Sequence, residues 1–284
     1  MPSDPSRALA AGIGLSRLAR YWALSAGVFT GLAYCGLMTA YEADRLHLAI
    51  AAAVFAAAVI SSVVGFAFSA VCGAMLLHLI DSPVRCVQIM MICCIAGQLL
   101  MVWSVRRHIE WNHLAVFLPG AVLGLPVGLL VLLNAQASYG RAIGLLLVAY
   151  ALFALLRPAI VLGKGHPLLD AAVGFLGGVT GAAAAFPGAF VTIWCGLKGW
   201  SKERQRGLYQ PFILITQIAG FILLCISGVG TSGAASVRFE GVLYLPAVML
   251  GTFVGMSCFK CLNDRQFAIA ANLLLIVSGV SLLA

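Results

Sequence analysis

Nine long apolar stretches constrain this chain more than any other feature of its sequence. Each approaches or exceeds the length of about 20 residues that a helix needs to cross a bilayer core about 30 Å thick. They occupy approximately residues 22–41, 48–80, 84–104, 112–133, 140–163, 168–198, 207–228, 239–262 and 266–284. A membrane β-barrel would instead show short segments of alternating hydrophobicity. The sequence therefore predicts an all-α polytopic membrane protein.

The composition agrees with this prediction and argues against other classes. Hydrophobic residues make up 62% of the 284 residues and charged residues 9%, whereas soluble domains have about 25% charged residues. The net charge of +8 does not indicate nucleic-acid binding, because the basic residues lie at the ends of apolar stretches. The five His residues form no ligand-spaced set, and Cys258 and Cys261 are a lone pair. We therefore predict neither a metal site nor a cofactor.

The chain divides into an N-terminal region and two predicted repeats of four segments each. Residues 1–21 are expected to form a basic cytoplasmic tail, and residues 22–47 an extra transmembrane helix with its loop. The repeats cover residues 48–163 and 164–284. At an offset of 119, Ser82, Arg85 and Gln98 match Ser201, Arg204 and Gln217. At an offset of 127, Pro119, Gly124 and Gly128 match Pro246, Gly251 and Gly255. At an offset of 113, Gly65 matches Gly178.

The first segment of each repeat is too long for one crossing and is interrupted by small residues. At 1.5 Å per residue, residues 48–80 would span about 50 Å as one helix. Broken at "GFAFSAVCG" or "GGVTGAAAAFPG", each segment either crosses once or turns back as a hairpin. Hairpins place thirteen of the 17 Lys and Arg residues in the cytoplasm, and single crossings place eleven there. The positive-inside rule therefore favours hairpins, which make the repeats inverted and put the N-terminus in the cytoplasm.

Breaks in membrane helices predict where a ligand binds, because unpaired backbone at membrane depth must be buried in protein or line a cavity. Discontinuous helices in inverted repeats are typical of secondary transporters, where half-helix N-termini point at anions. We expect the second break to hold an anion, with Pro187 starting the departing half-helix. Its predicted substrate-binding residues are Gly177, Gly178, Thr180, Gly181, Pro187, Gln98, Gln217 and Arg204.

Some of these residues also have a structural interpretation. Gln98 and Gln217 are equally expected to hold helices together through hydrogen bonds. Arg204 belongs to the basic turn "KGWSKERQRG", which also serves as a topology signal.

The second half of the chain resembles a known family. "VGFLGGVTGAAAAFPGAFVTIWCGLKGWSKERQRG" is similar to the second-repeat signature of the sulfite exporter TauE/SafE family of membrane permeases. The resemblance extends from about residue 48, through "FLPGAVLGLPVG" in the first half. There the run of glycines reads "GFAFSA", and Ala74 stands where a Pro is expected. The resemblance implies secondary transport of small anions such as sulfite, sulfonates or related organosulfur anions across the bacterial inner membrane.

Other functions remain open at this point. The alternatives are an anion channel and a non-transporting membrane subunit or scaffold. An intramembrane enzyme is disfavoured, because acids, bases or metal ligands at depth would be needed and Asp170 alone starts an apolar segment. The expected partners are a small anionic substrate and the lipid bilayer, and a homo-oligomer is left open.

Overall fold

The structure is a computed structural model in which part of the chain is described. The described residues are 45–64, 67–134, 141, 144, 145, 148, 149, 152, 167–227, 239–259, 276 and 280, without the side chains of 63, 64, 202, 203, 258 and 259. The predicted tail, the extra N-terminal helix and most of the predicted helices at 140–163 and 266–284 lie outside these residues.

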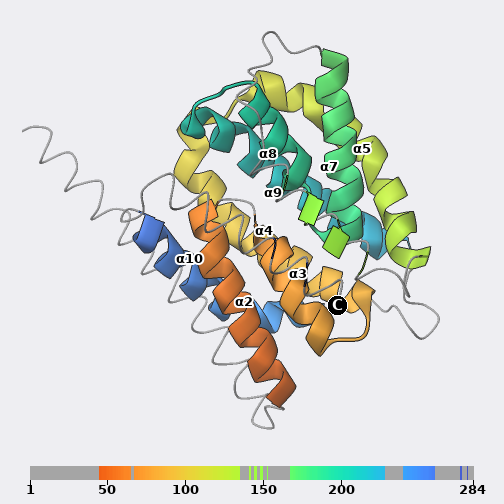
Figure 1. Cartoon of the computed structure of the whole chain (residues 1–284), viewed down its shortest axis with the longest axis vertical. Coiled ribbons are helices and arrows are strands. Elements are labelled where there is room, and N and C mark those ends of the chain that lie inside the picture. Colours follow the sequence, from red (N-terminus) through yellow and green to blue (C-terminus); the bar gives the residue numbers. More distant parts are fainter. Residues whose placement is uncertain are drawn as a thin grey trace, which may run out of the picture. The chain divides into compact units, whose positions relative to one another are not determined.

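The regular structure of the described residues is entirely helical (Figure 1). Six of these helices are long and apolar enough to cross a membrane, which confirms the predicted fold class. The elements are α2 (Arg45–Val64), α3 (Phe68–Leu79), α4 (Pro83–Val105), η1 (Arg106–His108), α5 (Trp111–Asn134), α7 (Pro167–Ala184), α8 (Gly188–Leu197), α9 (Lys202–Ile226), η3 (Phe239–Tyr244) and α10 (Leu245–Phe259).

The helices α7 and α8 form an antiparallel hairpin. Asp170 lies in the first turn of α7, and Lys198 directly follows α8. The Lys198 ammonium lies 2.6 Å from the Asp170 carboxylate, to which the Trp194 indole N–H also donates. The start of one arm and the end of the other therefore lie together, so the chain turns back at the break between them.

The helices α2 and α3 turn back in the same way. Glu240 contacts His47, near the start of α2, and Arg85, which follows the end of α3 by a few residues. Both ends of this hairpin therefore lie beside the same carboxylate. Each long apolar segment is thus two helical arms that begin and end on one side.

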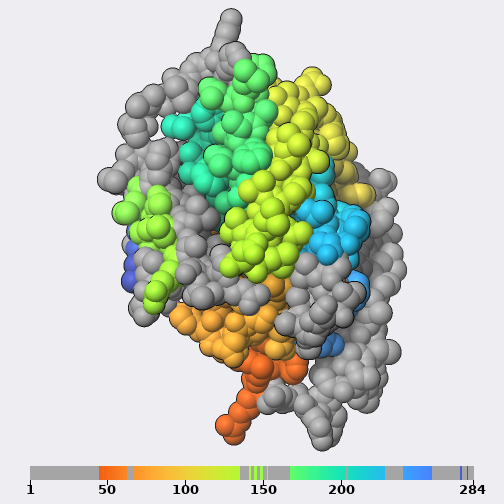
Figure 2. All heavy atoms as spheres, turned by 90° about the vertical axis from the view of Figure 1, so that its right-hand side faces the viewer, coloured from red at the N-terminus to blue at the C-terminus, as the bar shows by residue number. Residues whose placement is uncertain are grey.

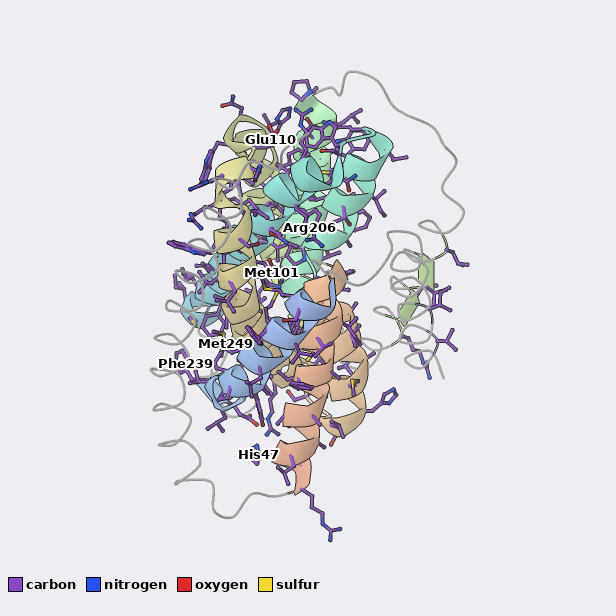
Figure 3. The ribbon with its side chains drawn as sticks, turned by 90° about the vertical axis from the view of Figure 1, so that its left-hand side faces the viewer. His47, Met101, Glu110, Arg206, Phe239 and Met249 are labelled. Carbon is purple, nitrogen blue, oxygen red and sulfur yellow. The ribbon has the colours of Figure 1, made fainter. Side chains whose placement is uncertain are left out.

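The helices α4 and α9 run antiparallel between the two hairpins. The Glu110 N–H, just beyond α4, donates to the Gly207 carbonyl near the start of α9 at 3.2 Å. At the opposite end of α4, Arg85 forms a two-point ion pair with Glu240, both bonds at 2.7 Å. Figure 3 labels Glu110 at one end, His47 and Phe239 at the other, and Met101 between them. Corresponding helices of the two halves therefore point in opposite directions.

Glycines bring α5 into direct backbone contact with α7, as the yellow-green and green atoms in Figure 2 show. A Cβ on Gly124 would lie 2.1 Å from the Phe175 carbonyl oxygen, and one on Gly128 the same distance from that of Val179. Such distances leave no room for any side chain. We call this contact the α5–α7 seam.

A second seam joins α10 to α2 by the same device. A Cβ on Gly251 would lie 2.6 Å from the Phe55 carbonyl oxygen, and one on Gly255 2.2 Å from that of Val59. Each seam thus joins the third segment of one predicted repeat to the first helix of the other. This confirms that the G-x-x-x-G pairs pack helices closely.

These contacts correct the sequence match of the first segments. At the α2–α10 seam the glycines of α10 face Phe55 and Val59. At the α5–α7 seam the equivalent glycines of α5 face Phe175 and Val179. Equivalent residues of the two first segments are therefore 120 positions apart. The match of Gly65 with Gly178 at 113 is therefore wrong. The corrected offset pairs Ala67 with Pro187, and these two residues are the N-caps of α3 and α8. The position equivalent to the proline is thus Ala67, not Ala74.

The caps of α4 and α9 agree with the predicted repeat. Ser82 and Ser201 each accept a hydrogen bond from the backbone N–H three residues later, that of Arg85 or Arg204, both at 3.4 Å. These matched caps and seams support the internal repeat, while duplication itself stays a prediction.

The seams predict which glycines the fold requires. We expect Gly124→Ala and Gly178→Ala to lower the free energy of unfolding by about 1–3 kcal/mol or more, since Cβ atoms there would lie 2.1 Å and 2.2 Å from backbone oxygens. Gly97→Ala is the control, because its Cβ would meet only side chains at 3.5 Å. Thermal unfolding in detergent measures the difference. Equal unfolding temperatures for the three variants would contradict this account.

Candidate functional site

The break between α7 and α8 is a tight, buried turn. Ala185 has a φ of 53°, a conformation that residues other than glycine rarely adopt. The Phe186 N–H donates to the Thr180 carbonyl at 3.1 Å, and Pro187 caps α8 as predicted. The buried Gln217 of α9 donates its amide N–H to the Ala185 carbonyl. Gln217 therefore holds the break from a neighbouring helix.

The four other predicted residues of this stretch lie within α7 rather than at the break. Gly178 belongs to the α5–α7 seam, and Gly177 faces Phe212 of α9. Gly181 faces Thr216 and Pro187, and the Thr180 hydroxyl donates to carbonyls of its own helix.

Their position decides which N–H groups are available to a ligand. An N–H within a helix donates to the carbonyl four residues before it, whereas the first turn of a helix leaves its N–H groups without such partners. The N–H groups at the break therefore belong to the first turn of α8, beginning at Gly188. The part of Gly177, Gly178, Thr180 and Gly181 in substrate binding stays a prediction.

The two breaks lie close together in the protein interior. Ala70 and Ala74 of α3 pack against Ala184, Phe186 and Ala189 around the second break. The N-terminal half of α3 therefore lies directly beside the turn that starts α8.

Buried polar side chains link these elements. The Cys94 thiol of α4 interacts with the Ser69 hydroxyl in the first turn of α3 and with the Gln217 amide. These three residues are at most 5% exposed. Gln98 is four residues after Cys94, so the two share one face of α4. The structure thus brings Gln98 and Gln217 to the same buried region.

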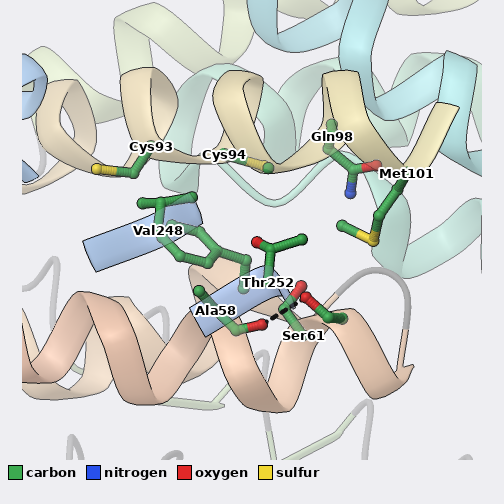
Figure 4. A pocket seen from close by; sticks show the side chains of 11 residues that line it. Ala58, Ser61, Cys93, Cys94, Gln98, Met101, Val248 and Thr252 are labelled. Carbon is green, nitrogen blue, oxygen red and sulfur yellow. Dashed lines mark hydrogen bonds between the residues drawn. The ribbon is translucent and has the colours of Figure 1, made fainter. Parts of the chain in front are cut away.

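A small cavity opens beside this polar region, between α2, α4 and α10 (Figure 4). Gln98 and Met101 point into it from α4, opposite Thr252 and Ser61. Its free space admits about one water molecule. The lining residues are Ala58, Ser61, Ser62, Phe68, Cys93, Cys94, Gly97, Gln98, Met101, Val248 and Thr252.

Arg204 lies apart from the other predicted site residues. It is in the first turn of α9, thirteen residues or about 20 Å before Gln217 along the helix. Its guanidinium pairs with Glu110 at 3.1 Å and lies over the Trp200 ring. Its side chain is 42% exposed. The structure therefore places Arg204 at one end of the bundle, and its contact with substrate stays a prediction.

Three groups of residues were missed by the sequence reasoning. They are the cavity hydroxyls Ser61, Ser62 and Thr252, the buried pair of Asp170 and Lys198, and the acidic partners Glu110 and Glu240. Each is a polar residue inside or beside an apolar run, which is a visible signal. Nothing in the sequence, however, showed which of them meet, because these contacts join residues that are distant in the chain.

No cluster of three potential metal ligands occurs among the described residues. The Cys258 side chain and Cys261 lie outside them.

A comparison with protein-family models identifies the sulfite exporter TauE/SafE model, which matches residues 50–282. No curated protein and no solved structure matches the chain. The family match covers most of the chain and implies a membrane transporter of sulfite-type anions. With its helical, multi-span architecture, the chain belongs to the sulfite exporter TauE/SafE family.

Proposed function

We propose that the protein is a secondary transporter that moves sulfite or a small sulfonate across the bacterial inner membrane by alternating access. The observation that carries this proposal is the meeting of two oppositely directed hairpins, whose breaks lie beside Ser69, Cys94 and Gln217. Oppositely directed repeats with helix breaks at the centre are the architecture of many secondary transporters.

The chemistry of the centre suits an anion that must also be released. The first turns of α3 and α8 present backbone N–H groups with a partial positive charge. Ser69 adds a hydroxyl and Gln217 an amide. All of these donors are neutral, so they bind an anion without the deep energy minimum that a buried permanent cation would create.

Two ion pairs at opposite ends of the bundle suit the two gates of such a mechanism. Arg85 of the first repeat pairs with Glu240 of the second, and Arg204 of the second pairs with Glu110 of the first. Each pair therefore joins the two halves at one face. In this proposal one pair opens while the other stays closed.

The distribution of charge supports one orientation in the membrane. The end that carries Glu110 also holds six Lys and Arg residues, namely Arg106, Arg107, Lys198, Lys202, Arg204 and Arg206. Among the described helix ends, the opposite face has Arg45 and Arg85. The positive-inside rule then favours the Glu110 end as the cytoplasmic one. A cytoplasmic N-terminus stays a prediction, which requires the predicted helix at 22–41 to cross the membrane once.

Transport can be tested in proteoliposomes with sulfite, methanesulfonate and taurine. We expect saturable sulfite uptake that is accelerated by counter-flow, which a carrier shows and a channel does not. Absence of uptake of all three anions would contradict the transport proposal, and uptake without counter-flow would favour a channel.

Gln217→Glu tests the centre of the molecule. The substitution keeps the side-chain shape but replaces the N–H that the Ala185 carbonyl accepts with a carboxylate oxygen, which cannot donate when ionised and repels an anion. We therefore expect sulfite transport to fall at least about tenfold, the effect of a lost hydrogen bond and added repulsion. Gln205→Glu is the matched control, because Gln205 bonds the Trp200 carbonyl near the cytoplasmic start of the same helix. Equal transport by the two variants would contradict a central role for Gln217.

The orientation can be tested by cysteine accessibility in a cysteine-depleted protein. A membrane-impermeant thiol reagent should label His108→Cys only from the cytoplasm and Arg45→Cys only from outside. His108 follows the C-terminal end of α4, beside Glu110, whereas Arg45 begins α2 at the opposite face of the bundle. Both positions are exposed. The reverse pattern would invert the proposed orientation, and labelling of both from one side would remove the hairpin topology.

A further inference from the structure

The cavity between α2, α4 and α10 lies where the first repeat has smaller residues than the described part of the second repeat has at the equivalent positions. The offset of 119 in α4 and α9 pairs Cys93 with Phe212 and Gly97 with Thr216. In the second repeat, a Cβ atom added to Gly177 would lie 2.9 Å from the Phe212 ring. A Cβ atom added to Gly181 would lie 3.0 Å from the Thr216 methyl group. Larger side chains therefore fill the space that Cys93 and Gly97 leave open in the first repeat.

The open space is lined by hydroxyl groups rather than by a purely apolar surface. Ser61 is 1% exposed, and its hydroxyl has no hydrogen-bond partner among the described residues. Thr252 is also 1% exposed and lies opposite, on α10. The neighbouring Ser62 donates to the Ala58 carbonyl at 2.7 Å. A buried hydroxyl without a partner is destabilising, so Ser61 is costly to the fold unless something binds it.

The surroundings of the cavity favour an anion as the ligand. Phe68, the first residue of α3, lines it, so the positive end of this twelve-residue helix adjoins the cavity. No acidic residue lines it, which leaves a cation without a charged ligand. The Ser61 and Thr252 hydroxyls can both donate hydrogen bonds.

We propose that this cavity, formed by α2 and α4 of the first repeat and α10 of the second, is a substrate subsite, where Ser61 and Thr252 donate hydrogen bonds to a compact oxyanion. The proposal rests on the transport function proposed above and adds to it a location and a size limit. Because the free space admits about one water molecule, a compact oxyanion such as sulfite enters only when α10 moves away from α2, and a sulfonate with a carbon chain requires a larger movement. The subsite therefore favours sulfite over taurine.

The experiment uses the full chain, with sulfite as the probe and taurine as the larger anion. Two readouts are taken: the half-saturation concentration of uptake in proteoliposomes, and the unfolding temperature in detergent with and without sulfite. Ser61→Ala and Thr252→Val should each raise the half-saturation concentration about ten- to hundredfold, the effect of losing a hydrogen bond to a charged group. Without sulfite, Ser61→Ala should unfold at the same or a higher temperature, because it removes an unpaired hydroxyl.

Thr216→Val is the matched control. Thr216 is equally buried, and its hydroxyl also lacks a partner among the described residues, but it lies in the filled space of the second repeat. We expect its half-saturation concentration to equal that of the wild type. Unchanged sulfite transport by Ser61→Ala and Thr252→Val, or an equal loss in Thr216→Val, would overturn the subsite and leave the transport function standing. A wild-type protein that neither transports sulfite nor is stabilised by it would overturn both.

Discussion

The close backbone contact at the two glycine seams is the constraint on which the rest of the structure depends. In hydrocarbon, water provides no driving force for helix association, so helices join where small residues allow close van der Waals contact. Here the α5–α7 and α2–α10 seams each join one repeat to the other. Neither half can therefore complete its own packing. Because each hairpin packs against a helix of the other repeat, the two hairpins are held in opposite directions and their breaks are brought together.

The centre of the molecule follows from this arrangement. A helix break exposes backbone groups that a bilayer cannot satisfy, and here neighbouring helices supply partners. Gln217 binds the Ala185 carbonyl, and Cys94 connects Gln217 with Ser69 of the other hairpin. These contacts give Gln217 the structural role that the sequence left open, and they place it where a ligand between the breaks would lie. The two interpretations of this residue are thus compatible.

The three ion pairs serve a different purpose from the central polar groups. Asp170 and Lys198 have side chains that are 8% and 6% exposed and tie the two arms of one hairpin. Arg85 with Glu240 and Arg204 with Glu110 instead tie the two halves to each other at the two faces. The Arg204 pair is the more exposed of these two, so solvent weakens it more. The ion pairs at the two faces thus hold the halves together in addition to the two seams.

The sequence by itself determined the membrane character, the positions of the spans within the described residues and the break before α8. These features depend on local properties, namely apolar length and the missing N–H of Pro187. It also identified the paired G-x-x-x-G motifs and the symmetric glutamines.

Only the tertiary structure decided which surfaces those residues meet. Gly178 and Gly128 look different in the sequence, one in a glycine-rich break and one in a packing motif, yet both lie in one seam. The cavity beside Ser61 exists because Cys93 and Gly97 are small where Phe212 and Thr216 are large. The offset of 119 pairs these residues in the sequence, but only the structure shows the space that they fill or leave open, because packing depends on residues from distant helices and no local pattern records them.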